Sequence, residues 1–117
     1  MPMFEDREKA AERKFEREQE LKFRIRARRN KLLGLWAAGH MGLAGEAARR
    51  YAQTVVDAEI TGHDDRAVIA KVRDDLTAGG APMAEEHIRG QLAALGAEAR
   101  AQLQRNGGTG ADPSERS

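Results

Sequence analysis

The chain changes character within residues 27–38, which read Ala27-Arg28-Arg29-Asn30-Lys31-Leu32-Leu33-Gly34-Leu35-Trp36-Ala37-Ala38. This stretch contains the only tryptophan, and it separates a highly charged segment from one in which apolar residues recur at helical spacing. A helix-prone segment that is polar in its first half and apolar in its second can pack only the second half onto a core. We therefore expect a folded region that begins near residue 21 and a preceding segment with a separate role.

The composition indicates a small all-α domain. The chain has 117 residues, of which 40% are hydrophobic and only 4% aromatic, so leucine, valine, isoleucine and alanine must build the core. That mixture favours helices over sheets. The absence of cysteine excludes disulfides, thiolate metal ligands and thiol nucleophiles. No apolar run is long enough to cross a membrane and the N-terminus lacks the apolar stretch of a secretory signal, so we expect a cytoplasmic protein.

Four helices follow from the spacing of apolar residues and from the positions of glycine, proline and capping residues. They cover residues 4–38, 46–60, 64–77 and 82–105, and the Gly-rich tail at 106–117 is expected to be disordered. We expect Asp64 to be the N-cap of the third helix and Pro82 to lie in the first turn of the fourth. Gly34 is expected to permit close helix packing, and Lys71 to pair with Asp75.

The same spacing predicts the inward face of each helix. In the first helix the expected residues are Leu21, Ile25, Arg28, Leu32, Leu35 and Trp36, with the stem of Arg28 packed and its guanidinium at the edge. In the other three helices they are Ala48, Tyr51, Ala52, Val55 and Val56, then Val68, Ile69, Val72 and Leu76, then Ala84, Ile88, Leu92, Leu95, Ala99 and Leu103.

Helix length separates residues 1–20, here called the arm, from residues 21–105. A continuous first helix would be about 50 Å long, whereas the other three would be about 20–33 Å long. We therefore expect a four-helix bundle over 21–105 and an arm that projects from it or is disordered. The arm carries charges of both signs and spaces Phe4, Ala11 and Phe15 by seven and four residues. That narrow stripe suits docking in a groove, although a charged N-terminal segment is also typical of a solvated extension.

Six stretches together resemble the zeta subunit of the F-type ATP synthase of alphaproteobacteria, a small intrinsic ATPase inhibitor. The most specific of them is residues 27–38. The others are Phe4-Glu5-Asp6-Arg7-Glu8, Glu12-Arg13-Lys14-Phe15, Tyr51-Ala52-Gln53-Thr54-Val55-Val56, Gly62-His63-Asp64-Asp65 and Lys71-Val72-Arg73-Asp74-Asp75-Leu76. The resemblance covers nearly the whole chain except the tail.

The resemblance implies a four-helix bundle with an N-terminal inhibitory arm. In that family the arm inserts into the catalytic head, between catalytic subunits and the rotor, and blocks rotation in the direction of ATP hydrolysis. The protein would then be no enzyme. It would be a monomer when free, with the catalytic head and rotor subunits as partners, peripheral to the inner membrane on the cytoplasmic side.

Carried over residue by residue, the resemblance assigns partner binding to Phe4, Glu5, Asp6, Arg7, Glu8, Lys9, Ala11, Glu12, Lys14 and Phe15. The signature residues of the bundle are Arg28, Arg29, Asn30, Leu32, Leu35 and Trp36. Ala11 stands where the family usually has Phe, which removes an apolar anchor from the arm, and Gly39 stands where it usually has Glu. No cofactor is expected. Adenine-nucleotide binding would be weak, and the sequence holds no signature for it.

The alternative is a basic helical protein that binds nucleic acid or acts as an adaptor. Residues 21–31 carry six bases and no acid, a pattern suited to neutralising phosphates. Against it, the net charge of the chain is only +1 and no aromatic set is available to stack on bases. The acidic pairs Asp64-Asp65 and Glu85-Glu86 lie at expected helix starts, where they favour the helix dipole, and are not read as catalytic. The three histidines lack metal-ligand spacing, so no metal site is expected.

Overall fold

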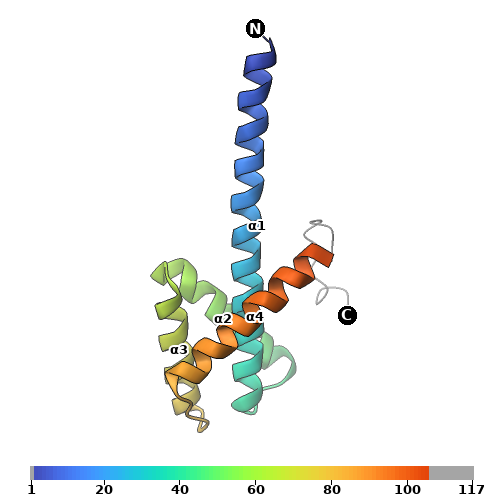
Figure 1. Cartoon of the computed structure of the whole chain (residues 1–117). Helices are drawn as coiled ribbons and strands as arrows, with labels where there is room; N and C mark the ends of the chain where they lie inside the picture. The colour runs from blue at the N-terminus through green and yellow to red at the C-terminus, as the bar shows by residue number, and fades with distance from the viewer. Residues whose placement is uncertain (1, 106–117) are drawn as a thin grey trace.

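The computed structural model describes residues 2–105, with side chains from Arg7 onward, so the tail predicted at 106–117 lies outside the described residues. Four helices follow one another: α1 (Pro2–His40), α2 (Gly45–Gly62), α3 (Asp65–Ala78) and α4 (Glu85–Arg105). No strand occurs between residues 2 and 105, and the chain is all-α, as predicted from its composition (Figure 1).

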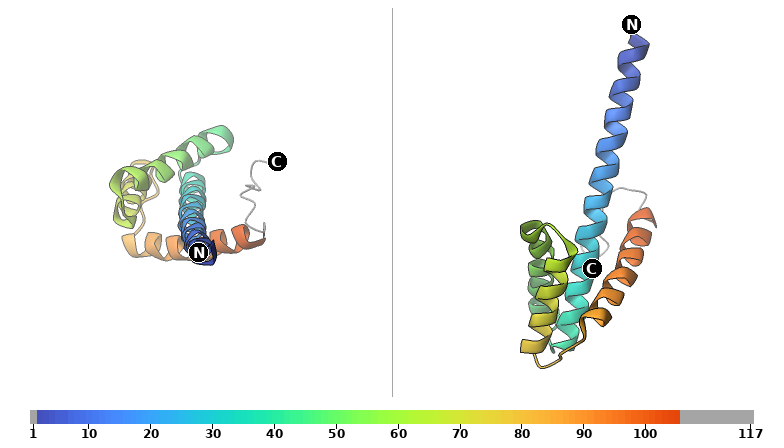
Figure 2. Two further views of the ribbon diagram at one scale, coloured as in Figure 1. Left: turned by 90° about the horizontal axis from the view of Figure 1, so that it is seen from above. Right: turned by 60° about the vertical axis from the view of Figure 1, so that its left-hand side comes forward.

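α1 is the central helix. It contacts α2, α3 and α4, whereas α2 and α4 do not contact each other in the described range. Seen along α1, these two helices lie on opposite sides of it and α3 closes a third side (Figure 2). α1 has 39 residues and is about 58 Å long, against about 21–32 Å for the other three. Its N-terminal half therefore projects from the bundle, and the arm is helical and projecting over its described residues 2–20.

The core consists of aliphatic side chains from all four helices. Its buried residues are Leu33, Ala37, Val55, Val68, Ile69, Val72, Leu76, Ile88 and Leu92. All four predicted inward residues of α3 are buried, and so are Ala48, Ala52 and Val55 of α2 and Ile88, Leu92, Ala99 and Leu103 of α4. Tyr51, Val56 and Leu95 are only partly buried, and Ala84 is exposed because α4 begins after it.

The inward face predicted for α1 is wrong by about one residue. The buried positions are Asn30, Leu33, Gly34, Ala37 and Ala38. The predicted residues Ile25, Arg28, Leu32, Leu35 and Trp36 flank this face and are partly buried, and Leu21 is exposed. The reason is the close approach of the neighbouring helices, which fit against small side chains and displace the larger ones to the flanks.

Gly34 permits that close approach, as predicted. A Cβ atom at this position would lie 2.5 Å from the Cα atom of Ala52 and 3.2 Å from a methyl group of Val55. The first of these neighbours is backbone, which cannot rotate away. A glycine on α1 is therefore what lets α1 and α2 pack at this distance.

The connections follow local chemistry. Asp64 is the N-cap of α3, since its carboxylate accepts a hydrogen bond from the backbone N–H of Ala67 at 3.0 Å. The predicted Lys71–Asp75 pair is present at 3.0 Å. Asp75 also accepts from the Tyr51 hydroxyl at 2.9 Å, and burial together with this bond raises the pKa of Tyr51. The prediction for Pro82 is wrong, because α4 begins at Glu85 and Pro82 lies in the connection before it.

Candidate functional site

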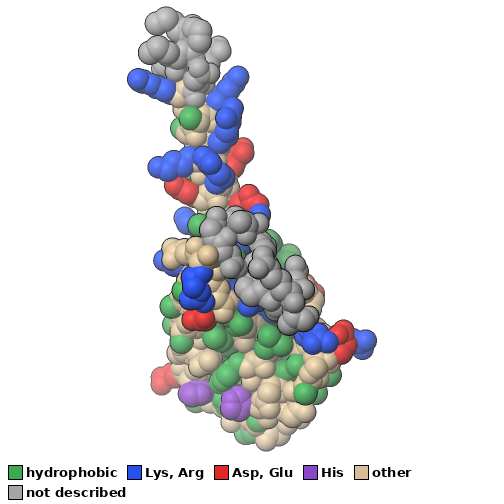
Figure 3. All heavy atoms as spheres, turned by 90° about the vertical axis from the view of Figure 1, so that its right-hand side faces the viewer, with side chains coloured by type: hydrophobic (Ala, Val, Ile, Leu, Met, Phe, Trp, Pro, Cys, Tyr) green, Lys and Arg blue, Asp and Glu red, His purple; other side chains and the backbone are tan. Residues whose placement is uncertain are grey.

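The arm and the turn that follows it form the most exposed part of the described chain. Every side chain from Arg7 to Phe23 is exposed. Between Met3 and Arg24 the sequence has no glycine, proline or β-branched residue, which suits a helix that has no neighbours to support it. Figure 3 shows basic and acidic side chains around the projecting helix, while hydrophobic side chains gather over the bundle below.

The charged side chains of the arm form rows of like charge along the helix. Glutamates recur every fourth residue, and a parallel row of bases runs beside them. The acidic row is Glu8, Glu12, Glu16 and Glu20, and the basic row is Lys9, Arg13 and Arg17. Residues four apart are neighbours on a helix surface, so each row places like charges side by side, while each base also lies three residues before a glutamate of the acidic row.

These rows keep their charges available to a partner. Among the residues with described side chains, the ion pair that involves the arm is Arg24–Glu20 at 2.6 Å, at its lower end. No ion pair with another described residue involves the side chains from Arg7 to Glu18. The arm thus offers an acidic row and a basic row, together with Phe15, whose side chain is 63% exposed.

The structure brings only some of the arm residues implied by the resemblance to one face. Arg7, Ala11 and Phe15 are exposed at successive four-residue steps and so share one face, with Glu8 and Lys14 beside it. Glu12 and Lys9 lie farther around the helix. The side chains of Phe4, Glu5 and Asp6 lie outside the described residues.

The basic segment below the arm is held by the bundle. Arg29 forms ion pairs with Glu59 of α2 at 3.3 Å and with Asp65 of α3 at 2.8 Å. Arg28 donates from Nε to Gln102 of α4 at 2.7 Å. The hydrogen bond from Arg29 holds the pKa of Asp65 below its usual range. Because bundle side chains engage Arg28 and Arg29, two of the six bases are taken out of the set that the phosphate-binding alternative would use.

Asn30 completes this network. Its side chain is buried, accepts a hydrogen bond from Arg29 at 3.1 Å and donates from Nδ2 to Glu59. A buried amide with both its oxygen and its nitrogen engaged stabilises one arrangement of the helices. The signature residues Arg29 and Asn30 therefore join α1 to α2 and α3 at the point where the arm leaves the bundle.

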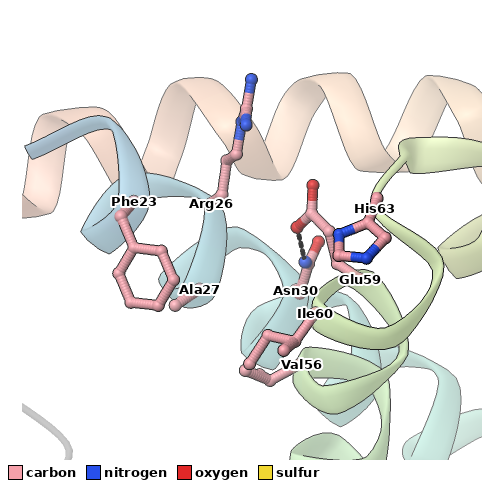
Figure 4. Close-up of a pocket in the computed structure, with 8 residues that line it drawn as sticks. All are labelled: Phe23, Arg26, Ala27, Asn30, Val56, Glu59, Ile60 and His63. Carbon is pink, nitrogen blue, oxygen red and sulfur yellow. Dashed lines mark hydrogen bonds between the residues drawn. The ribbon is translucent and has the colours of Figure 1, made fainter. Parts of the chain in front are cut away.

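A groove opens at that same point, and it was not foreseen from the sequence. This junction groove has a volume of about 190 Å³. Its lining residues are Phe23, Arg26, Ala27 and Asn30 of α1, Val56, Glu59 and Ile60 of α2, and His63 (Figure 4). The one signal in the sequence was Phe23, a large apolar residue inside a basic run.

Trp36 lies on a different face of the bundle. It is partly buried against the core, and its ring centroid is 4.9 Å from that of His40 and 5.9 Å from that of His87. In the part of the chain with described side chains, no three potential metal ligands come together. None of the described helices is both long and apolar enough to span a membrane.

Fold and surface together define a small helical protein with one long charged helix that projects from a bundle. The chain belongs to the ATPase inhibitor subunit zeta family, whose model matches residues 1–102. No match was found among curated proteins. Membership of this family supports an inhibitory role and an interaction with the ATP synthase.

Proposed function

We propose that the protein inhibits ATP hydrolysis by the F-type ATP synthase, and that it does so by inserting its arm into the catalytic head and blocking rotation there. The observation that supports this most is the arm itself. It is a continuous helix whose described side chains are all exposed, so it gains nothing from packing on its own bundle. A long exposed helix with a solvent-exposed phenylalanine is suited to docking in a groove on a partner.

The bundle has a physical role in this mechanism. Starting a helix in water is unfavourable, while extending one costs little. The arm is the extension of a helix whose second half is already fixed by the core, so it needs no nucleation. Ordering a flexible chain on binding would cost about 1–2 kcal/mol per residue, and a preformed helix reduces that cost.

The docking chemistry divides between one apolar face and two charged rows. Phe15 supplies the largest described apolar surface of the arm, and Ala11 one turn before it supplies much less. The acidic and basic rows require a partner that presents both signs of charge. Such a surface sets orientation and specificity more than affinity.

The test is a titration of ATP hydrolysis by a cognate ATP synthase with four proteins: the natural chain, Phe15→Ala, Ala11→Phe and Ala10→Phe. Burial of a phenylalanine contributes about 1.5–3 kcal/mol, so Phe15→Ala should weaken inhibition roughly 10- to 100-fold. Ala11→Phe should strengthen it. Ala10→Phe adds the same ring about 100° around the helix and should bring no gain. Equal potency for Phe15→Ala and the natural chain would show that the apolar face of the arm does not dock.

A further inference from the structure

Exposed apolar surface is concentrated at the arm and its base. Five large hydrophobic side chains are exposed among the described residues. They are Phe15, Leu21, Phe23, Leu43 and Ile60. Four of these lie on the projecting part of α1 or beside it, and Leu43 alone lies elsewhere, in the connection between α1 and α2. Phe23 and Ile60 are 61% and 55% exposed and face the junction groove.

The groove exists because α2 is shorter than α1. Lower in the bundle, Gly34 of α1 packs closely on Ala52 of α2. α2 ends at Gly62, and His63 turns the chain away with φ of 63°, in the left-handed region. α1 continues past this point without α2 beside it, so the surface of α1 that faces α2 in the bundle is left uncovered there. Ala27 and Val56 are the partly buried floor of the groove, and Phe23 and Ile60 are its exposed walls.

The charge available at the rim is positive. Arg26 lines the groove and is exposed, and Lys22 lies one helical turn before it on α1. Glu59 also lines the groove, but it is bound by Arg29 and Asn30. Asp64 and Asp65, which line a neighbouring hollow with Arg26, form ion pairs with Arg66 and Arg29. A ligand for this groove therefore needs apolar bulk and a negative charge.

We propose that the junction groove is a second docking site of the inhibitor, which takes a large apolar side chain of the catalytic head that lies beside a carboxylate. This inference rests on the proposed function, since insertion of the arm is what brings the surface of the head against the base of α1. A volume of about 190 Å³ accommodates one ring or one leucine-sized side chain. The adjacent carboxylate pairs with Arg26. The arm then blocks rotation, and the groove slows dissociation.

The first test compares Phe23→Gln, Ile60→Gln and Arg26→Gln with Leu43→Gln in the ATPase titration. Leu43 is 37% exposed and lies in the connection before α2, whereas the groove lies at the other end of α2, so it is the matched apolar-to-polar control. The three groove variants should each need at least five- to tenfold more protein for half-inhibition, and Leu43→Gln should stay within twofold of the natural chain. Circular dichroism should show that all variants keep their helix content and melting temperature.

Two results would overturn the inference in distinguishable ways. If the natural chain inhibits and the groove variants inhibit equally well, the groove does not dock and the proposed function stands. If the natural chain does not inhibit, the proposed function falls and the inference falls with it. Ile60→Gln lies outside the arm, so a weakened Ile60 variant cannot be explained by damage to the arm.

A second test identifies the occupant directly. A photo-crosslinking amino acid at position 60 should crosslink to a catalytic-head subunit, at a peptide that contains an acidic residue, and the same group at position 43 should not. Crosslinking of position 60 to a second copy of this chain would contradict the proposal.

Discussion

Substitution of Gly34 by alanine tests the packing of α1 on α2. The added Cβ atom would lie 2.5 Å from the Cα atom of Ala52 and 3.0 Å from its Cβ atom, whereas nonbonded carbons prefer about 3.5–4.0 Å. The helices must separate by roughly an ångström to remove the overlap. Overpacking of this kind costs about 1–3 kcal/mol. Alanine gains up to about 1 kcal/mol over glycine in helix propensity, which offsets part of the cost.

A matched control separates the gain in helix propensity, from glycine to alanine, from the cost of overpacking. Gly90 lies inside α4, and a Cβ atom there would meet no neighbouring atom within 4 Å. Gly90→Ala should therefore raise the stability by about 0.5–1 kcal/mol. The two variants should differ by the overpacking cost of about 1–3 kcal/mol, which is at least about 4 °C in melting temperature for a domain of this size.

Thermal denaturation followed by circular dichroism at 222 nm measures both variants under one condition. Gly34→Ala should melt below the natural chain and Gly90→Ala above it. Equal shifts of the two melting temperatures would refute the close approach of α1 and α2 on which the arrangement of the bundle depends.

Three further predictions follow from the contacts of the bundle. Arg29→Met leaves Glu59 without its cation and should cost about 1–3 kcal/mol in urea denaturation. Arg29 also lowers the folded-state pKa of Asp65 below 3.8, so the stabilisation from the Arg29–Asp65 pair is present above pH 3.8 and is lost as the pH falls through the folded-state pKa. The natural chain should therefore lose more stability than Arg29→Met in this acid range, and parallel curves of stability against pH would contradict the Arg29–Asp65 pair. Tyr51 is the only tyrosine and its pKa is raised, so phenolate absorbance at pH 10 should be absent from the folded protein and half-developed in the urea-unfolded chain, whereas equal absorbance would show that the hydroxyl is solvated. Trp36→Ala should cost less than the roughly 3–5 kcal/mol of a fully buried aromatic, and a loss at the top of that range would mean that Trp36 is core.

The helices could be predicted from sequence because their signals are local. Asp64 caps α3 through a backbone N–H only three residues away, and the spacing of Val68, Ile69, Val72 and Leu76 needs no knowledge of the other helices. Pro82 misled the prediction because a proline is acceptable both in a first helical turn and in a loop.

The face of α1 could not be predicted in the same way. Apolar spacing finds the core side of a helix that is covered on one side, but α1 is contacted by all three other helices. Its innermost residues include Asn30, Gly34 and Ala37, which carry little or no hydrophobic signal, while Leu35 and Trp36 lie on the flanks.

The junction groove and the network beside it depend on contacts between distant residues. Asn30 and Glu59 are 29 positions apart in the chain, and their hydrogen bond exists only once α2 has packed on α1. The exposure of Ile60 depends on α1 extending beyond the end of α2, a relation between two helices that neither sequence segment contains.

The central claim is that the arm inhibits and the bundle supports it. The direct test compares the natural chain with a variant that lacks residues 2–19 in one titration of ATP hydrolysis by the cognate ATP synthase. All described side chains removed by this deletion are exposed, so the variant should keep its melting temperature within about 2 °C. It should no longer inhibit ATP hydrolysis at concentrations at which the natural chain inhibits fully. Full inhibition by a folded variant without the arm would contradict this account and assign inhibition to the bundle.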